Sequence, residues 1–308
     1  MLALSGLTDV FKVIGILYLL LLVGAFALAI WLGYKKRWVW MTIVLVVFGY
    51  YPVKVNIQAY QRKQVYEAQK ALFEKRCENA GVKIYKTVEN VEGILLLKVR
   101  PKSNTRDWGD PMWPGAAFAS EYGGETQIQL LLQYEHAPES FDTYAGKFVA
   151  RPNDRGTFSA VKTNKPGYRF VDVKESDGKI YRYTLKTWQE PASWDKSKFL
   201  DKSQLIKEES GSGQIARYAL TYDDDINPAD RAQWVAGSTI KVLDTQTNET
   251  LATFTRYAAD FGRGNGSGGR SPWLNAKVCG YAVQAMAGVE SRYFVDQILK
   301  PIPIKTSN

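Results

Sequence analysis

The chain has 308 residues, of which 45% are hydrophobic and 23% are charged, and it carries a formal net charge of +9. These are the proportions of an ordinary globular protein rather than of a low-complexity chain. The basic excess requires no nucleic-acid partner, because none of the usual nucleic-acid-binding modules is present. Anionic lipid headgroups account for it, since seven basic residues stand beside two apolar windows: Lys35, Lys36, Arg37, Lys54, Arg62, Lys63 and Lys70.

Two uncharged apolar windows near the N-terminus predict a transmembrane hairpin over residues 1–54. The first span covers about residues 12–34, with no charged residue between Lys12 and Lys35, and a helix of this length crosses a bilayer. The second span covers about residues 38–53, and aromatic residues mark both of its ends, as at a membrane interface. A cleaved signal peptide is the alternative for the first window, and a buried or re-entrant segment for the second.

The connector between the two windows sets the expected orientation. It contains Lys35, Lys36 and Arg37 and no acidic residue. Positive residues in short loops stay in the cytoplasm, so the hairpin tip is expected inside and the large domain outside the inner membrane. In a Gram-negative host that outer side is the periplasm. The basic residues that follow the second span argue for the opposite orientation.

Two cysteines, Cys77 and Cys279, stand near the two ends of the soluble part. An even number of cysteines in an oxidising compartment favours a disulfide, so this pair is predicted to be bridged and supports the outward orientation. A loop of about 200 residues closed in this way stabilises a fold by roughly 4–5 kcal/mol in loop-entropy terms. The alternative is two unpaired buried thiols that pack as small hydrophobic side chains.

Residues 55–81 predict an amphipathic helix that leaves the bilayer, kinked at Pro52, and carries the domain. Gly81 is expected to cap its end. Its apolar face is expected to pack against the chain's own domain, and a coiled-coil stalk that pairs with a second copy is the alternative. That face consists of Ile57, Tyr60, Val65, Ala68 and Leu72.

Residues 82–308 predict a mainly antiparallel β domain with flanking helices, so the fold class is α+β with a membrane anchor. Short β-branched and apolar segments between turn residues indicate the strands, and two neighbouring pairs indicate hairpins. A last helix is expected from about Trp273, ended by Pro301 and Pro303. The expected strands are residues 82–88, 93–101, 126–135, 167–173, 179–185, 214–222, 238–244 and 249–258.

Few residues suggest catalysis. The lone histidine, His136, has no second histidine or cysteine near it in the sequence, so the common zinc patterns are absent. No nucleophile elbow accompanies it. Trp108 and Trp113 stand in a long loop, where they line a ligand groove or, as the favoured interpretation, fill a gap over the sheet.

An acidic cluster resembles part of a calcium loop. Asp223, Asp225 and Asn227 have the alternate spacing of calcium ligands, but the sixth and twelfth positions hold Pro228 and Trp234 instead of Gly and Glu. Asn227 is therefore predicted to cap a short helix whose first position is Pro228. No metal site is predicted.

The glycine-rich segment 260–280 has no phosphate-binding fingerprint, because no lysine follows its glycines. Arg263 and Arg270 stand near an expected helix start, with Ser271 as the cap and Pro272 in the first position, and form a candidate anion site. The favoured interpretation is slack chain, followed by a helix that the disulfide fixes in place.

These observations predict an inner-membrane protein anchored by a two-helix hairpin, with a periplasmic domain that binds a partner protein or an envelope component. No catalytic constellation supports an enzyme, and no cofactor is predicted. One alternative is a cytoplasm-facing, membrane-associated sensor or defence protein. Another is a membrane-bound hydrolase whose carboxylate site the sequence spacing does not reveal.

Overall fold

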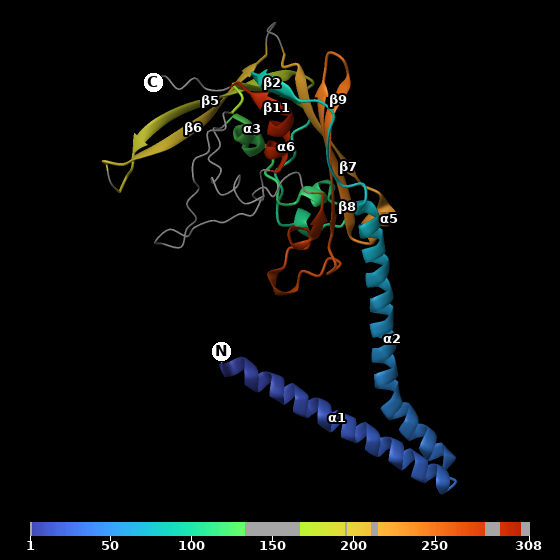
Figure 1. The fold of residues 1–308 in the computed structure, drawn as a ribbon. Helices are drawn as coiled ribbons and strands as arrows, with labels where there is room; N and C mark the ends of the chain where they lie inside the picture. Colours follow the sequence, from blue (N-terminus) through green and yellow to red (C-terminus); the bar gives the residue numbers. More distant parts are fainter. Residues whose placement is uncertain (1, 133–166, 195, 211–214, 281–289, 303–308) are drawn as a thin grey trace. The chain divides into compact units, whose positions relative to one another are not determined.

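A computed structural model describes residues 2–132, 167–194, 196–210, 215–280 and 290–302 (Figure 1). The chain divides into two compact units, Met1–Ala68 and Gln69–Asn308. His136 lies outside the described residues.

The first unit contains helix α1 (Leu2–Tyr34) and most of helix α2 (Trp38–Cys77). Both helices are long and apolar enough to cross a membrane. They contact each other through Tyr18 and Tyr51, whose ring centroids are 6.2 Å apart, and Ala25 and Ala29 of α1 are only 8% and 3% exposed. Most of their large apolar side chains point outward, as Leu20 and Val39 do at 61% and 73% exposure.

Helix α2 is one continuous helix over two segments that were predicted as separate elements. The expected span 38–53 and most of the expected connecting helix 55–81 form one element of 40 residues with Pro52 inside it. The expectation that Gly81 caps the helix is wrong. The helix ends at Cys77, and Gly81 begins the first strand with a φ of 113°, a conformation that glycine adopts without strain.

The second unit is built on a nine-stranded sheet with the order β1-β9-β8-β7-β3-β4-β5-β6, and β10 also pairs with β9 (Figure 1). The strands are β1 (Gly81–Ile84), β3 (Gly93–Leu96), β4 (Phe170–Lys174), β5 (Ile180–Pro191), β6 (Phe199–Glu209), β7 (Tyr218–Asp225), β8 (Val235–Asp244), β9 (Glu249–Ala259) and β10 (Lys277–Cys279). A separate parallel pair joins β2 (Val88–Val91) to β11 (Leu299–Pro301).

The sheet is mixed: most of its strand pairs are antiparallel, as expected, but β3 makes parallel pairs that were not predicted. Strand β3 runs parallel to both β4 and β7, whereas the other described pairs of this sheet are antiparallel. All four residues of β3 are buried. A short, continuously apolar strand is typical of a position covered on both faces, where parallel pairing occurs.

Short helices cover the sheet and complete the core. They are η1 (Asp107–Gly109), η2 (Pro114–Phe118), α3 (Glu125–Leu132), α5 (Pro228–Ala232), η3 (Ser267–Gly269), η4 (Trp273–Asn275) and α6 (Glu290–Ile298). Phe254 of β9 contacts Phe118 of η2 and Phe294 of α6, with ring centroids 5.4 Å and 5.5 Å apart. The main core therefore lies between one face of the sheet and these two helices.

Both hairpins expected from the sequence are present. Strand β4 pairs with β5 and β8 pairs with β9, each in antiparallel register. Their turns carry the residues that the turn requires, with Gly178 and Asn248 at φ angles of 82° and 57°. Strand β6, which pairs with β5 along eleven residues, was not predicted.

Two elements differ from the prediction. The expected strand 126–135 contains helix α3, whose buried Ile128, Leu131 and Leu132 follow helical spacing. The expected helix from Trp273 is a single 3-10 turn followed by strand β10. Gly280 then turns the chain with a φ of 75°, and a Cβ there would lie 2.3 Å from the carbonyl oxygen of Thr255. The described residues resume as a helix only at Glu290.

The end of α2 is tied to the sheet by several bonds. Cys77 and Cys279 form a disulfide with their Cα atoms 5.8 Å apart, as predicted. The side chain of Gln69 is fully buried, and its Nε2 donates to the carbonyl oxygen of Asp260 at 2.9 Å. Phe73 packs with Val235 in a small apolar cluster. Residues 69–77 are thus part of the domain.

Candidate functional site

A polar row crosses three neighbouring strands on the core side of the sheet. The strand register pairs Asp224 of β7 with Ser238 of β8, and Ser238 with Arg256 of β9. Residues that pair directly across strands point to the same face of a sheet. The next row on that face contains Ile240 and Phe254, which are buried apolar residues. The row therefore places charged groups inside the core.

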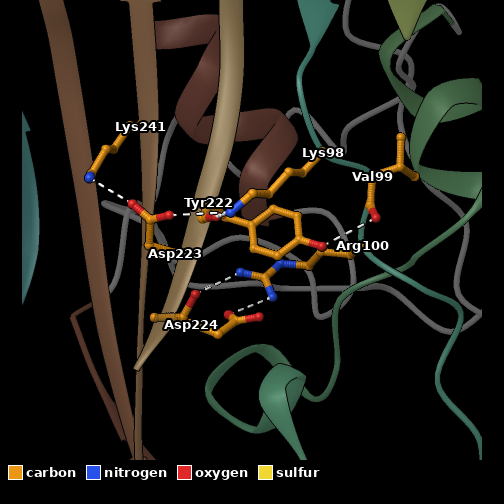
Figure 2. Close-up of polar contacts among 8 residues, drawn as sticks. Lys98, Val99, Arg100, Tyr222, Asp223, Asp224 and Lys241 are labelled. Atoms are coloured by element: carbon orange, nitrogen blue, oxygen red, sulfur yellow. Dashed lines mark hydrogen bonds and ion pairs between the residues drawn. The ribbon is translucent and has the colours of Figure 1, made fainter. Parts of the chain in front are cut away.

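Arg100 completes this row from above the sheet (Figure 2). Its side chain is 6% exposed, and its Nη1 lies 3.1 Å from Oδ1 of Asp224. Its Nη2 donates to Oγ of Ser238 at 2.7 Å. The guanidinium also lies 4.1 Å from the ring centroid of Tyr222 and 4.7 Å from that of Phe118. Two polar partners and two aromatic rings hold one cation in place.

The backbone of Arg100 positions helix α3. Its N–H donates to Oε1 of Gln127 at 3.0 Å, and its carbonyl oxygen accepts from the N–H of Gly124 at 2.7 Å. Gly123 lies against the same segment, where a Cβ would approach the carbonyl oxygen of Pro101 to 2.3 Å. Only glycine allows this close approach. The start of α3 is therefore fixed to the residue that carries the buried cation.

A second buried ion pair extends the row toward α6. Arg256 is bonded to Glu290, and the two residues are 5% and 6% exposed. The ring of Phe118 contacts both arginines, with its centroid 4.7 Å from the guanidinium of Arg100 and 5.2 Å from that of Arg256. One aromatic side chain of η2 thus packs on two buried cations, each of which has its own carboxylate.

Glu121 is the most perturbed carboxyl group of the cluster. Its pKa is raised to about 7, mainly by burial; the neighbouring charge of Glu290 also raises the pKa, and the hydrogen bonds from Ser291 lower it. The N–H of Ser291 donates to Oε1 of Glu121 at 3.1 Å, and the Ser291 hydroxyl donates to the same oxygen. Its Oε2 has no hydrogen-bond partner among the residues that the structure describes. Glu121 can therefore hold a proton near neutral pH, as a general acid or base does.

The opposite face of the same strands carries a solvated ion cluster (Figure 2). Asp223 accepts from Nζ of Lys241 at 2.7 Å and from Nζ of Lys98 at 3.3 Å. The hydrogen bond from Lys241 is the main cause that lowers the pKa of Asp223. The three side chains are 55%, 38% and 53% exposed, so water screens these pairs strongly.

The acidic cluster of the sequence acts as a helix cap. Oδ1 of Asn227 accepts from the N–H of Ala229 at 2.9 Å, and Pro228 takes the first helical position of α5, as predicted. Of the residues that have the spacing of calcium ligands, Asp223 is paired with lysines and Asn227 is used by the cap. Among the described residues, no group of three or more His, Cys, Asp or Glu side chains could hold a metal ion.

The glycine-rich loop is ordered by a buried carboxylate, which corrects the expectation of slack chain. Asp260 is fully buried and accepts from the N–H groups of Gly262 and Gly264 at 3.1 Å and 2.8 Å. Arg270 binds the same carboxylate. A Cβ at Gly264 would lie 2.1 Å from the ring of Trp234. The glycines are therefore required by close packing around Asp260.

Arg263 and Arg270 have separate partners within the chain. Arg263 donates to the carbonyl oxygen of Ala232 at 3.2 Å, and Arg270 donates to the carboxylate of Asp260. An external anion bound by both residues stays a prediction. Ser271 does not cap a helix, because Pro272 stands at the cap position of η4 and no side chain caps it.

The two tryptophans of the long loop have different roles. Trp113 packs against the main core, as the gap-filling interpretation predicts. The indole N–H of Trp108 donates to the hydroxyl of Ser103 at 3.3 Å within its own loop.

Comparison of the chain with protein-family models, with curated proteins and with solved structures finds no match. This cluster was not predicted from the sequence; its charged members outside β7 are Arg100, Glu121, Arg256 and Glu290. The one signal in the sequence is the acidic end of β7, where alternate residues point to opposite faces. The arrangement holds the segment 98–121 and helix α6 on the sheet, and burial raises the pKa of its carboxyl group Glu121.

Proposed function

We propose that the protein is anchored in the inner membrane by its two apolar helices and binds a partner protein or an envelope component through its sheet domain, without catalysis. The outward-pointing apolar side chains of α1 and the first part of α2 carry this proposal. Leu20, Ile30 and Val39 are 61%, 73% and 73% exposed. Apolar surface of this extent is stable in lipid and unfavourable in water.

Two features support a periplasmic domain. The turn between the helices contains only basic charges, which favours a cytoplasmic position for the hairpin tip. The disulfide between Cys77 and Cys279 favours an oxidising compartment for the domain. A cytoplasm-facing sensor or defence protein is the alternative, and it requires the two cysteines to be reduced in the cell.

The buried charges support binding rather than catalysis. Arg100 and Arg256 are each paired with a carboxylate of the same chain and are 5% exposed, so they contribute to the internal architecture. One observation favours a membrane-bound hydrolase as a second candidate. Glu121, with a pKa of about 7, contacts the hydroxyl of Ser291, and a carboxyl group near this pKa suits proton transfer.

Fractionation of cells that express the full-length chain tests the anchor and the orientation. The protein is expected in the membrane pellet after carbonate extraction, and its C-terminal domain is expected to be degraded by protease added outside spheroplasts. Maleimide is expected to label the chain only after reduction. Soluble protein would exclude the anchor. A domain protected from protease, with two reactive thiols, would instead favour the cytoplasm-facing alternative.

A further inference from the structure

The part of α2 that precedes the domain presents large apolar side chains at the spacing of a coiled coil. Tyr50, Val53, Ile57 and Tyr60 follow one another at intervals of three, four and three residues and are 64%, 57%, 52% and 65% exposed. Alternation of three and four places side chains in one stripe along a helix. Ile57 and Tyr60 belong to the apolar face for which the sequence also offers a stalk that pairs with a second copy.

The domain packs on another side of the same helix. Gln69 and Phe73 are its buried residues, at 0% and 3% exposure. Phe73 follows Ile57 by sixteen residues, which at about 100° per residue places it on roughly the opposite side of an ideal helix. The side chains that α2 buries in the domain therefore lie on a different side of the helix from the stripe.

We propose that residues 50–64 of α2 pair with the same segment of a second copy, as a parallel two-stranded coiled coil at the membrane surface. The proposal rests on the membrane anchor proposed above. Two copies anchored in the same orientation present their stripes in parallel and at the same height. A partner must present apolar side chains at the same spacing and at the same height above the membrane. A second copy of the chain meets both conditions.

Gln64 favours self-pairing over other occupants. It continues the stripe four residues after Tyr60 and is exposed. A side-chain amide has both donors and acceptors, so two copies of it satisfy each other, whereas two lysines or two glutamates would repel. A single polar residue at such a position also fixes the register and the number of helices.

Disulfide scanning of the full-length protein in native membranes tests this pairing. Ile57→Cys and Tyr60→Cys lie in the stripe, and Gln58→Cys and Arg62→Cys are matched controls that lie about 100° or more away from both stripe residues. The native cysteines are bridged to each other. After mild oxidation, we expect covalent dimers at positions 57 and 60 at a yield at least fivefold higher than at 58 and 62, and none from the wild type.

The other outcomes overturn the proposal. Equal yields at all four positions would indicate random collision, and no dimer at any position would mean that the stripe does not pair. A product of a different mass at position 57 would identify another occupant, a lateral partner protein. Carbonate extraction of the same membrane samples distinguishes a failure of the pairing from a failure of the anchor. A variant that stays in the carbonate-resistant pellet without dimers excludes only the pairing, whereas a soluble chain excludes both.

Discussion

The two faces of strands β7, β8 and β9 differ in what their charges do, although the residues are neighbours in the sequence. Asp224 points into the core, where its side chain is 11% exposed and contacts Arg100. Asp223 points to the other face, where its side chain is 55% exposed and contacts two lysines. One step along a strand thus separates a carboxylate that requires a partner from one that water solvates.

Two small apolar clusters lie on the outer face, and α2 packs on one of them. Val235 and Ala259 pair across β8 and β9 and pack with Phe73 of α2. The disulfide holds this contact, because Cys77 is in the last turn of α2 and Cys279 of β10 pairs with Tyr257 of β9. At this end the outer face is therefore held by one covalent bond and a small apolar cluster, whereas Arg100 and Asp224 form a buried ion pair on the inner face.

Removal of the disulfide is expected to have the largest effect. In the double variant Cys77→Ser/Cys279→Ser, the unfolded chain regains the freedom of a loop of 202 residues. We expect the unfolding free energy of the domain to fall by about 4–5 kcal/mol. Denaturant unfolding of the purified full-length protein in detergent, followed by near-UV circular dichroism, measures this change. Reductant should destabilise the wild type equally and the double variant not at all.

Arg100→Ala is expected to have the next largest effect. It removes the guanidinium that is bonded to the largely buried carboxylate of Asp224, and loss of one partner from a buried pair reduces stability by about 3–5 kcal/mol. The same unfolding measurement applies. Lys241→Ala on the outer face is the matched control, with a loss of less than about 1 kcal/mol.

A double-mutant cycle identifies the cause of that loss. Arg100→Ala/Asp224→Ala removes both charges, so it should be destabilised by clearly less than the sum of the two single variants. Additive losses would mean that Arg100 acts through packing on Tyr222 and Phe118 alone, and the assignment of a buried ion pair would then be wrong.

The sequence predicted the elements whose signals are local. The two hairpins follow from alternating burial and from turn residues such as Gly178, and the cap at Asn227 follows from its side chain and the proline after it. The cysteine pairing was predictable because the chain has only two cysteines. In these cases the structure depends on interactions between residues that are close in the sequence, or only one pairing is possible.

The elements that were missed depend on distant partners. The apolar run of α3 fits a strand or a helix by periodicity, and the helix is fixed by the bond between Gln127 and the backbone of Arg100. Arg100 and Asp224 are 124 residues apart, so no local pattern brings them together. The parallel position of β3 is equally remote, because it depends on β4 and β7 from later parts of the chain.

Glu121 is expected to make the stability of the domain depend on pH. Its pKa is about 7 in the folded protein against an ordinary value of 4.5, so the folded state keeps a proton that the unfolded state loses between these values. Unfolding free energy should therefore fall as the pH rises from about 4.5 to 7, by about 3 kcal/mol in total, and then level off.

Glu121→Gln isolates this contribution. The amide oxygen still accepts from Ser291 but does not titrate. The difference in stability between the variant and the wild type should therefore grow from pH 5 to pH 8. A difference that stays constant over this range would show that Glu121 ionises at its ordinary pKa. The variant also tests the hydrolase alternative, because an enzyme that uses this carboxyl group would lose its activity.

Asp223→Asn is expected to have the smallest effect, and it completes the comparison of the two faces. The lysines lower the pKa of Asp223, so its contribution is present above its ordinary pKa and is lost as the pH falls through the lowered value. Because the side chains are about half exposed, that contribution should be less than about 1 kcal/mol near neutral pH. It should also shrink in 1 M salt, where charges are screened within about 3 Å.

Asp224→Asn, one residue further along β7, should lower the unfolding free energy several times more than Asp223→Asn. Salt should change this effect little, because the pair with Arg100 is buried. If the two variants were equally destabilised and equally sensitive to salt, burial would not be what separates the two faces.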